Sequence, residues 1–347
     1  MSSTYRIQWV DLCKGIAILL VVMAHFIQVF PSSDSILTIV ANCGSRGPQL
    51  FFIISAFLTW ASLSKQSDLT IKGYSVFVGS RLRRILPEYY LALGFSLVTF
   101  FGGLGYPQDV TWGGYISRLF LLNGFFPKYC NTILIVDWYV SNLMIFYLLA
   151  PLVKKFVNTF NKSLIFLLVS LLFSVVFHFL IAGIEEFVDY YSTLCFIVQL
   201  PVMALGIVLF YLCNGRENIN IKEFIRVNLS VILLGISSVL INIKFGCISK
   251  SFLAGIVLVW ICYTLAYVES NGIRLPSGIL PVLGKYSLGI YLFHMFIIKM
   301  ASLIPEIKWF SAGFGGWILS FVIITLISLG ISKMTNKLSN KLISWIM

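Results

Sequence analysis

Long apolar segments separated by short polar stretches dominate this chain. Ten of them hold about 20 residues each, the length at which a helix crosses the hydrocarbon core of a bilayer. Their predicted bounds are 9–30, 47–64, 84–105, 137–153, 163–183, 189–212, 226–243, 251–269, 281–302 and 312–332. The apolar positions do not alternate with the period of a strand, as they would in a transmembrane barrel. We therefore predict an all-α polytopic helical bundle, forming one membrane domain over residues 1–347 without a fused soluble domain.

Composition and charge agree with that class. Hydrophobic residues make up 59% of the 347 residues and charged residues only 11%, against roughly 25% charged in soluble domains. A net charge of +12 could suit nucleic acid, but most Lys and Arg residues fall on one side of the predicted spans, and the positive-inside rule explains this better. The rule predicts that both termini are cytoplasmic. Because it accounts for the positive charge, no nucleic-acid partner is predicted. The basic, amphipathic tail after residue 333 is predicted to form a surface helix that touches membrane lipid.

The first span carries three ionisable residues, Asp11, Lys14 and His25. Such groups are costly in hydrocarbon unless they face protein or water, so they indicate a functional site by default. In a helix, Lys14 and His25 would lie within about 20° of one face and roughly 16 Å apart along the axis. Asp11 would lie within about 60° of Lys14, close enough to orient it. A purely structural polar stripe, buried against other helices, is the alternative.

A cluster of arginines, Arg81, Arg83 and Arg84, precedes the third span on its predicted cytoplasmic side. Arg81 and Arg84 would share a helix face if the helix begins early enough. Guanidinium groups suit phosphate oxygens, although an ordinary cytoplasmic anchor would have the same composition. Lys14 on the same side favours a polyphosphate ligand.

Polar residues in later spans are weaker candidates. His294 has Tyr291 on the same helix face, and the pair could line a site or be hydrogen-bonded between helices. Ser55 lies in mid-span, where a lone serine usually bonds its own helix carbonyl. No nucleophile-elbow motif surrounds it, so a serine hydrolase is not favoured. Trp138 could be an interfacial anchor or the edge of a site. The scattered cysteines and histidines lack metal-ligand spacing, so no metal site is predicted.

Taken together, these stretches resemble the acyltransferase-3 family of integral-membrane acyltransferases. Lys14 and His25 match its Arg/Lys-x10-His pattern, and Arg81 with Arg84 matches its RxxR motif. The segments FFIISAFL, DWYV and SLGIYLFH are similar to its further motifs. Two departures are that Ala56 stands where the family usually has glycine, and that Lys14 replaces the commoner arginine, losing bidentate phosphate geometry.

The resemblance implies an O-acetyltransferase of the bacterial inner membrane. It would move an acyl group from cytoplasmic acyl-CoA, commonly acetyl-CoA, to a hydroxyl of a polysaccharide or lipid-linked glycan. His25 would be the general base, because a neutral imidazole with a pKa near 6.5 can take the hydroxyl proton. A covalent acyl-histidine is the alternative. The donor would bind Lys14, Arg81, Arg83 and Arg84, with Asp11 orienting Lys14, and the acceptor would bind Tyr291, His294, Trp138 and Ser55.

A polysaccharide transporter or export component is the rival class. Ten spans, proline-broken helices and intramembrane charges are typical of transporters as well. Transfer of a labelled acetyl group separates the two classes.

Overall fold

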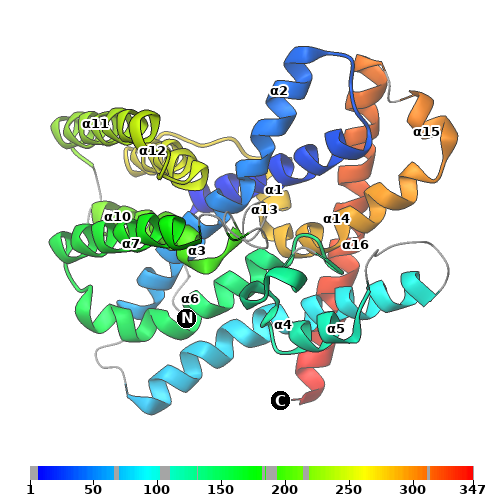
Figure 1. Cartoon of the computed structure of the whole chain (residues 1–347), viewed down its shortest axis with the longest axis horizontal. Helices are drawn as coiled ribbons and strands as arrows, with labels where there is room; N and C mark the ends of the chain where they lie inside the picture. Colours follow the sequence, from blue (N-terminus) through cyan, green and yellow to red (C-terminus); the bar gives the residue numbers. More distant parts are fainter. Residues whose placement is uncertain are drawn as a thin grey trace. The chain divides into compact units, whose positions relative to one another are not determined.

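The computed structural model describes residues 7–65, 70–101, 110–130, 132–181, 184, 194–213, 219–310 and 313–346. Within these ranges the chain consists of helices joined by loops, and no strand occurs there (Figure 1). The all-α class predicted from the sequence is confirmed. The chain forms two compact units that alternate along the sequence: Met1–Cys13, Gln49–Ser75 and Tyr139–Gly278 make the first, and Lys14–Pro48, Val76–Trp138 and Ile279–Met347 make the second.

The first unit is built mainly from six apolar helices. They are most of α3 (Gly47–Leu63), most of α6 (Trp138–Phe156), α7 (Phe160–Ile181), α10 (Phe196–Cys213), α11 (Ile221–Phe245) and α12 (Lys250–Ser270). Helix α7 packs on α10, α10 on α12 and α12 on α11. Helix α3 meets α10 closely, because a Cβ on Gly206 would lie 2.2 Å from the carbonyl oxygen of Ile53. A larger residue would force these two backbones apart.

The second unit contains most of α1 and α4 and the C-terminal helices. Its elements are α1 (Gln8–Val29), α2 (Ser35–Cys43), η1 (Gly44–Arg46), α4 (Ile71–Phe101), α5 (Trp112–Leu119), η2 (Asn123–Phe125), η3 (Pro127–Tyr129), α13 (Ile279–Lys285), α14 (Ser287–Ser302), α15 (Pro305–Phe310) and α16 (Phe314–Ile346). Helix α14 packs along α16, and α13 meets α14 at a bend of 89°. The indole Nε1 of Trp317 donates to the carbonyl of Phe30 at 2.8 Å, which fixes α16 against the end of α1.

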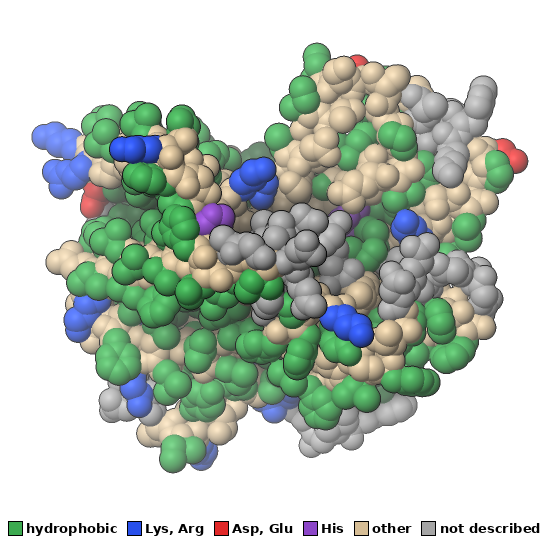
Figure 2. All heavy atoms as spheres, viewed as in Figure 1, with side chains coloured by type: hydrophobic (Ala, Val, Ile, Leu, Met, Phe, Trp, Pro, Cys, Tyr) green, Lys and Arg blue, Asp and Glu red, His purple; other side chains and the backbone are tan. Residues whose placement is uncertain are grey.

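Six helices in the described part of the chain are long and apolar enough to cross a membrane, and the bent pair α13–α14 can count as a seventh. The six are α1, α7, α10, α11, α12 and α16. Helices α3, α4 and α6 coincide with the three other predicted spans but do not meet the same length and composition criteria. Ten spans therefore stay a prediction, as do the cytoplasmic termini. Many large apolar side chains are exposed, as one face shows in Figure 2, and a bilayer would cover them.

Two helices are longer than the sequence pattern predicts. Helix α4 begins at Ile71, well before the predicted start at 84, so the arginine cluster lies inside it. Helix α16 continues to Ile346, and the basic tail is its extension, not a separate surface helix. Neither glycine nor proline occurs between 331 and 346 to end it.

Candidate active site

Two histidine rings face each other within the second unit. His25 lies on α1 and His294 on α14, and their ring centroids are 5.2 Å apart with the planes tilted by 41°. His294 is fully buried and His25 is half-buried. The sequence had placed both histidines inside spans, but it gave no sign that they meet.

The hydrogen bonds of His294 determine which of its nitrogens carries the proton. Its Nδ1 lies 2.7 Å from the carbonyl oxygen of Tyr291 and 3.1 Å from that of Ile290. Carbonyls only accept, so in the neutral ring Nδ1 holds the proton and Nε2 holds a lone pair. This Nε2 is buried and has no hydrogen-bond partner in the described part of the chain. Because an unsatisfied buried acceptor is costly, Nε2 is a natural place for the hydroxyl of a substrate.

His25 has its own polar neighbour on the same helix. Its Nδ1 lies 3.3 Å from Oε1 of Gln28, one turn further along α1. A neutral His25 that donates this bond keeps its lone pair on Nε2. Both rings can therefore act as proton or hydrogen-bond acceptors through Nε2.

Tyr291 holds α14 to the loop before α6. Its hydroxyl donates to the carbonyl of Val136, and its ring lies 6.0 Å from that of His294. The side chain is buried, and its hydroxyl is already bonded to backbone. The structure thus shows Tyr291 in a positioning contact beside the histidines, and its predicted contact with the acceptor stays a prediction.

A fully buried ion pair fixes that loop, and the sequence analysis missed it. Arg118 Nε lies 2.7 Å from Oδ2 of Asp137, and neither side chain is exposed. Asp137 also accepts hydrogen bonds from Tyr89, at 3.1 Å, and from Asn123, at 3.0 Å. These contacts join α4, α5 and the loop beside Val136. The sequence shows Arg118 and Asp137 as charges 19 residues apart in a largely apolar stretch, and nothing in the pattern pairs them.

The predicted donor-binding residues lie on α1 and α4. Lys14 is half-buried, eleven residues before His25 on the same helix. Because α4 begins early, Arg81 and Arg84 do share a helix face. Arg81 is half-buried, with its guanidinium 5.1 Å from the centroid of the Phe77 ring. Arg83 and Arg84 are exposed, and Arg83 lies on another face of the helix.

Two further cations in this unit surround an aromatic ring. Lys285 and Lys333 place their Nζ atoms 5.2 and 5.9 Å from the ring centroid of Tyr286, at the bend between α13 and α14. The backbone carbonyl of Tyr286 accepts a hydrogen bond from Ser332 at 2.8 Å, which ties the bend to α16. The sequence analysis counted both lysines only as cytoplasmic charges. Their approach to one ring depends on the packing of α13, α14 and α16.

Three helices cross closely where α14 passes α4 and α16. Glu88 is buried on α4 and accepts a hydrogen bond from Thr335 at 2.9 Å. A Cβ on Gly289 would lie 2.4 Å from Oε1 of Glu88 and 2.3 Å from Oγ of Ser332. A side chain at this position of α14 would force the Glu88 carboxylate and Ser332 to shift.

Gly289→Ala is expected to destabilise the protein by roughly 1–3 kcal/mol, because the added methyl group overpacks a buried crossing. The measurement is the midpoint of thermal unfolding of the purified protein. Gly330→Ala on α16 is the matched control, since a Cβ there meets nothing within 4 Å. It should be neutral or slightly stabilising, because alanine favours a helix. Equal effects of the two substitutions would contradict the close crossing.

The remaining predicted site residues are Asp11, Ser55 and Trp138. Asp11 and Ser55 belong to the first unit, where Ser55 Oγ lies 3.3 Å from the hydroxyl of Tyr139. Ser55 thus has a side-chain partner, where a bond to its own helix was expected. Trp138 is buried at the start of α6. The roles predicted for Asp11, Ser55 and Trp138 stay predictions.

The long apolar helices are those of an integral membrane protein. Residues 7–333 match the acyltransferase-3 family model, which is described as an acyltransferase domain. The chain belongs to this family, and the resemblance predicted from its motifs is confirmed. It is therefore a membrane acyltransferase.

One curated relative gives a more specific comparison. The exopolysaccharide production protein ExoZ of Rhizobium meliloti (strain 1021) is 28% identical over 106 residues. This alignment covers 30% of the present chain and 32% of ExoZ, so the chain matches about a third of the relative's length. No solved structure matches the chain.

Proposed function

We propose that this protein is an O-acyltransferase of a cell-surface or lipid-linked polysaccharide. It takes an acetyl or related acyl group from cytoplasmic acyl-CoA and transfers it to a sugar hydroxyl. The family and the similarity to an exopolysaccharide production protein support this class. The observation that carries the proposal is the His25–His294 pair, in which a buried Nε2 of His294 has no partner in the described part of the chain.

The reaction needs a base more than it needs an activated donor. A thioester is already reactive, whereas a sugar hydroxyl is a weak nucleophile until its proton is removed. In the proposed step, Nε2 of His25 takes the hydroxyl proton as the oxygen attacks the thioester carbonyl carbon. The carbon–sulfur bond then breaks, and His25 returns the proton to the departing CoA thiolate. No proton or electron is left over, and the histidine ends as it began.

His294 has a different task in this proposal. It is the more buried ring, and its Nδ1 is held by two backbone carbonyls. Its Nε2 would accept a hydrogen bond from a second hydroxyl of the same sugar and so orient the reacting one. A site built to bond a hydroxyl discriminates strongly against an analogue that lacks it. His294 would therefore contribute to the choice of sugar position.

The donor would extend along α1. Arg81, Arg84 and Lys14 would bind the CoA phosphates, with Arg83 adding positive charge nearby. Lys14 and His25 are roughly 16 Å apart along the helix axis, a length suited to the extended pantetheine arm. The thioester would then lie beside His25. Lys285 and Lys333, both close to the ring of Tyr286, would add a second cationic group for the nucleotide.

The direct test is transfer of a labelled acyl group by the purified protein in lipid. Labelled acetyl-CoA and a surface polysaccharide should give labelled glycan with release of one CoA thiol per acyl group transferred. Coenzyme A should raise the thermal stability of the protein, since a ligand that binds the folded state stabilises it. Polysaccharide export without acylation would instead identify a transporter. Label retained on His25 when the acceptor is left out would favour the covalent route.

Arg84→Gln is expected to raise KM for acyl-CoA by roughly tenfold or more, with a smaller change in kcat. A charge-assisted bond to phosphate is lost, and that bond serves binding more than chemistry. Initial rates over a range of acyl-CoA concentrations give both constants. Lys72→Gln is the matched control, because Lys72 is an exposed cation near the start of the same helix. An unchanged KM in Arg84→Gln would refute the phosphate role.

A further inference from the structure

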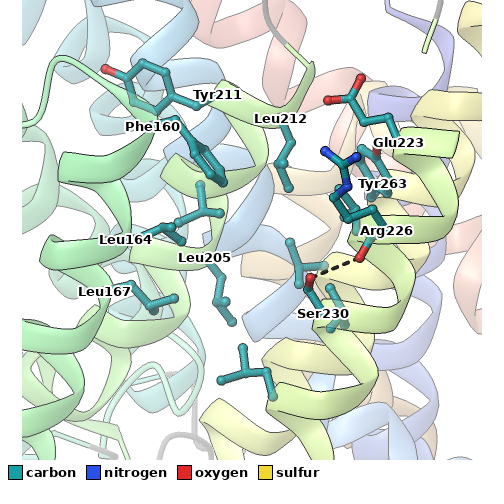
Figure 3. Close-up of a pocket in the computed structure, with 15 residues that line it drawn as sticks. Phe160, Leu164, Leu167, Leu205, Tyr211, Leu212, Glu223, Arg226, Ser230 and Tyr263 are labelled. Carbon is teal, nitrogen blue, oxygen red and sulfur yellow. Dashed lines mark hydrogen bonds between the residues drawn. The ribbon is translucent and has the colours of Figure 1, made fainter. Parts of the chain in front are cut away.

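A cavity of about 400 Å³ lies within the first unit (Figure 3). Its walls come from α7, α10, α11 and α12. Because α7 packs on α10 while α11 packs on α12, the cavity lies between these two helix pairs. Its volume is within the range of small-molecule sites, roughly 300–1,000 Å³.

The cavity is amphipathic along its length. Leucine side chains such as Leu164, Leu167 and Leu205 line one part of it, whereas Tyr211 and Glu223 lie at the opposite end (Figure 3). Arg226, one turn after Glu223 near that end, lines the cavity and is exposed. A ligand that fits must therefore carry a long apolar part and a polar head.

The polar end is rich in positive charge. Lys154 Nζ lies 3.2 Å from the hydroxyl of Tyr211, which lines the cavity. Lys222 lies one turn before Arg226 on α11 and is exposed. Of these three cations only Arg226 lines the cavity, together with the acid Glu223. Arg226 offers a planar guanidinium, the side chain best suited to phosphate oxygens. The charge of this end complements an anionic head group.

The cavity is open toward the side where lipid would lie. Arg226 and Ser230 both line it and both are exposed on α11. Only 6% of the apolar window of α11 is buried, so the outer face of this helix would contact the bilayer. The positive-inside rule predicts that Lys154, Lys222 and Arg226 lie at the cytoplasmic surface, where the leaflet is rich in anionic lipids.

We propose that this cavity binds one anionic glycerophospholipid of the cytoplasmic leaflet. One acyl chain lies against the leucines of α7 and α10, and the phosphate lies at Arg226, at the polar end of the cavity. The proposal rests on residues of the first unit alone. It does not depend on the acyl-transfer proposal, whose histidines are in the second unit.

The test uses the full chain, stripped of lipid in mild detergent and titrated with defined lipids. Native mass spectrometry counts bound phosphatidylglycerol and, separately, zwitterionic phosphatidylcholine. We expect one tightly held phosphatidylglycerol per chain and weaker phosphatidylcholine binding. Arg226→Gln should weaken phosphatidylglycerol binding about tenfold, as for the loss of one charge-assisted contact. Lys222→Gln removes a neighbouring charge that does not line the cavity, and should change the affinity less than twofold.

A second pair of variants tests the apolar part. Val231 lines the cavity on α11, so Val231→Trp should fill it and abolish retention of the lipid. Leu229→Trp adds the same bulk on an exposed position of that helix outside the cavity lining, and should leave retention unchanged. Arg226→Lys keeps the charge and should recover part of the lost affinity. Thermal unfolding of each variant shows whether it is folded.

Several outcomes would overturn the proposal. Equal losses of phosphatidylglycerol affinity in Arg226→Gln and Lys222→Gln would mean that the lipid is held by general attraction to the positively charged surface and not by a specific contact with Arg226. Unchanged retention in Val231→Trp would place the lipid elsewhere. Displacement of the lipid by inorganic phosphate alone, with no effect of Val231→Trp, would indicate a head-group site without a bound chain.

Discussion

His25→Ala is expected to lower the rate of acyl transfer by roughly 10²- to 10⁴-fold, the usual contribution of a positioned general base. The imidazole is the only group proposed to remove the hydroxyl proton, and alanine cannot replace it. Folding and membrane insertion should persist, because His25 is half-buried and its side chain is hydrogen-bonded to Gln28 on its own helix. Single-turnover transfer of a labelled acyl group measures the loss.

The matched control is His178→Ala, which removes an exposed histidine near the end of α7. It should transfer acyl groups at the normal rate.

Two substitutions of His294 test the roles of its Nδ1 and Nε2 atoms separately. Asparagine can keep a donor near the Tyr291 carbonyl but lacks Nε2, whereas glutamine can place a polar atom near the Nε2 position. Transfer should be slower with asparagine than with glutamine. Near-normal turnover in His25→Ala would refute the proposal that His25 is the general base.

Asp137→Ala is expected to lower the free energy of unfolding by roughly 3–5 kcal/mol, the typical result of removing one partner of a buried ion pair. It leaves the charge of Arg118 fully buried without its carboxylate partner, with hydrogen bonds to the backbone carbonyls of Gly114 and Tyr129. Because the neighbouring Val136 carbonyl receives the Tyr291 hydroxyl, the site beside His294 should loosen as well. Unfolding in denaturant and acyl-transfer rates together measure both effects.

A double substitution tests whether Arg118 and Asp137 are energetically coupled. Arg118→Met with Asp137→Leu removes both charges and should cost less than Asp137→Ala alone, since two apolar groups need no partners. The two single losses should therefore not add. Lys162→Ala is the control, because it removes only an exposed hydrogen bond to Asn158 and should stay within about 0.5 kcal/mol. Strictly additive losses would contradict a coupled pair.

The sequence by itself determined the fold class and the positions of most long helices. The predicted span 9–30 corresponds to α1 at Gln8–Val29, and 251–269 corresponds to α12 at Lys250–Ser270. Hydropathy is a sum over neighbouring residues, so it needs no knowledge of the rest of the chain. The family motifs are local in the same sense, and they identified the acyltransferase class before any contact was known.

Only the tertiary structure decided which polar groups meet. It brought His294 to His25, paired Arg118 with Asp137, and placed Lys285 and Lys333 at one ring. Each of these contacts depends on how helices far apart in the sequence pack and rotate, which no local pattern encodes. The lone pair on Nε2 of His294 is also a tertiary property. It follows from two backbone carbonyls that hold Nδ1 and from packing that leaves the other nitrogen buried.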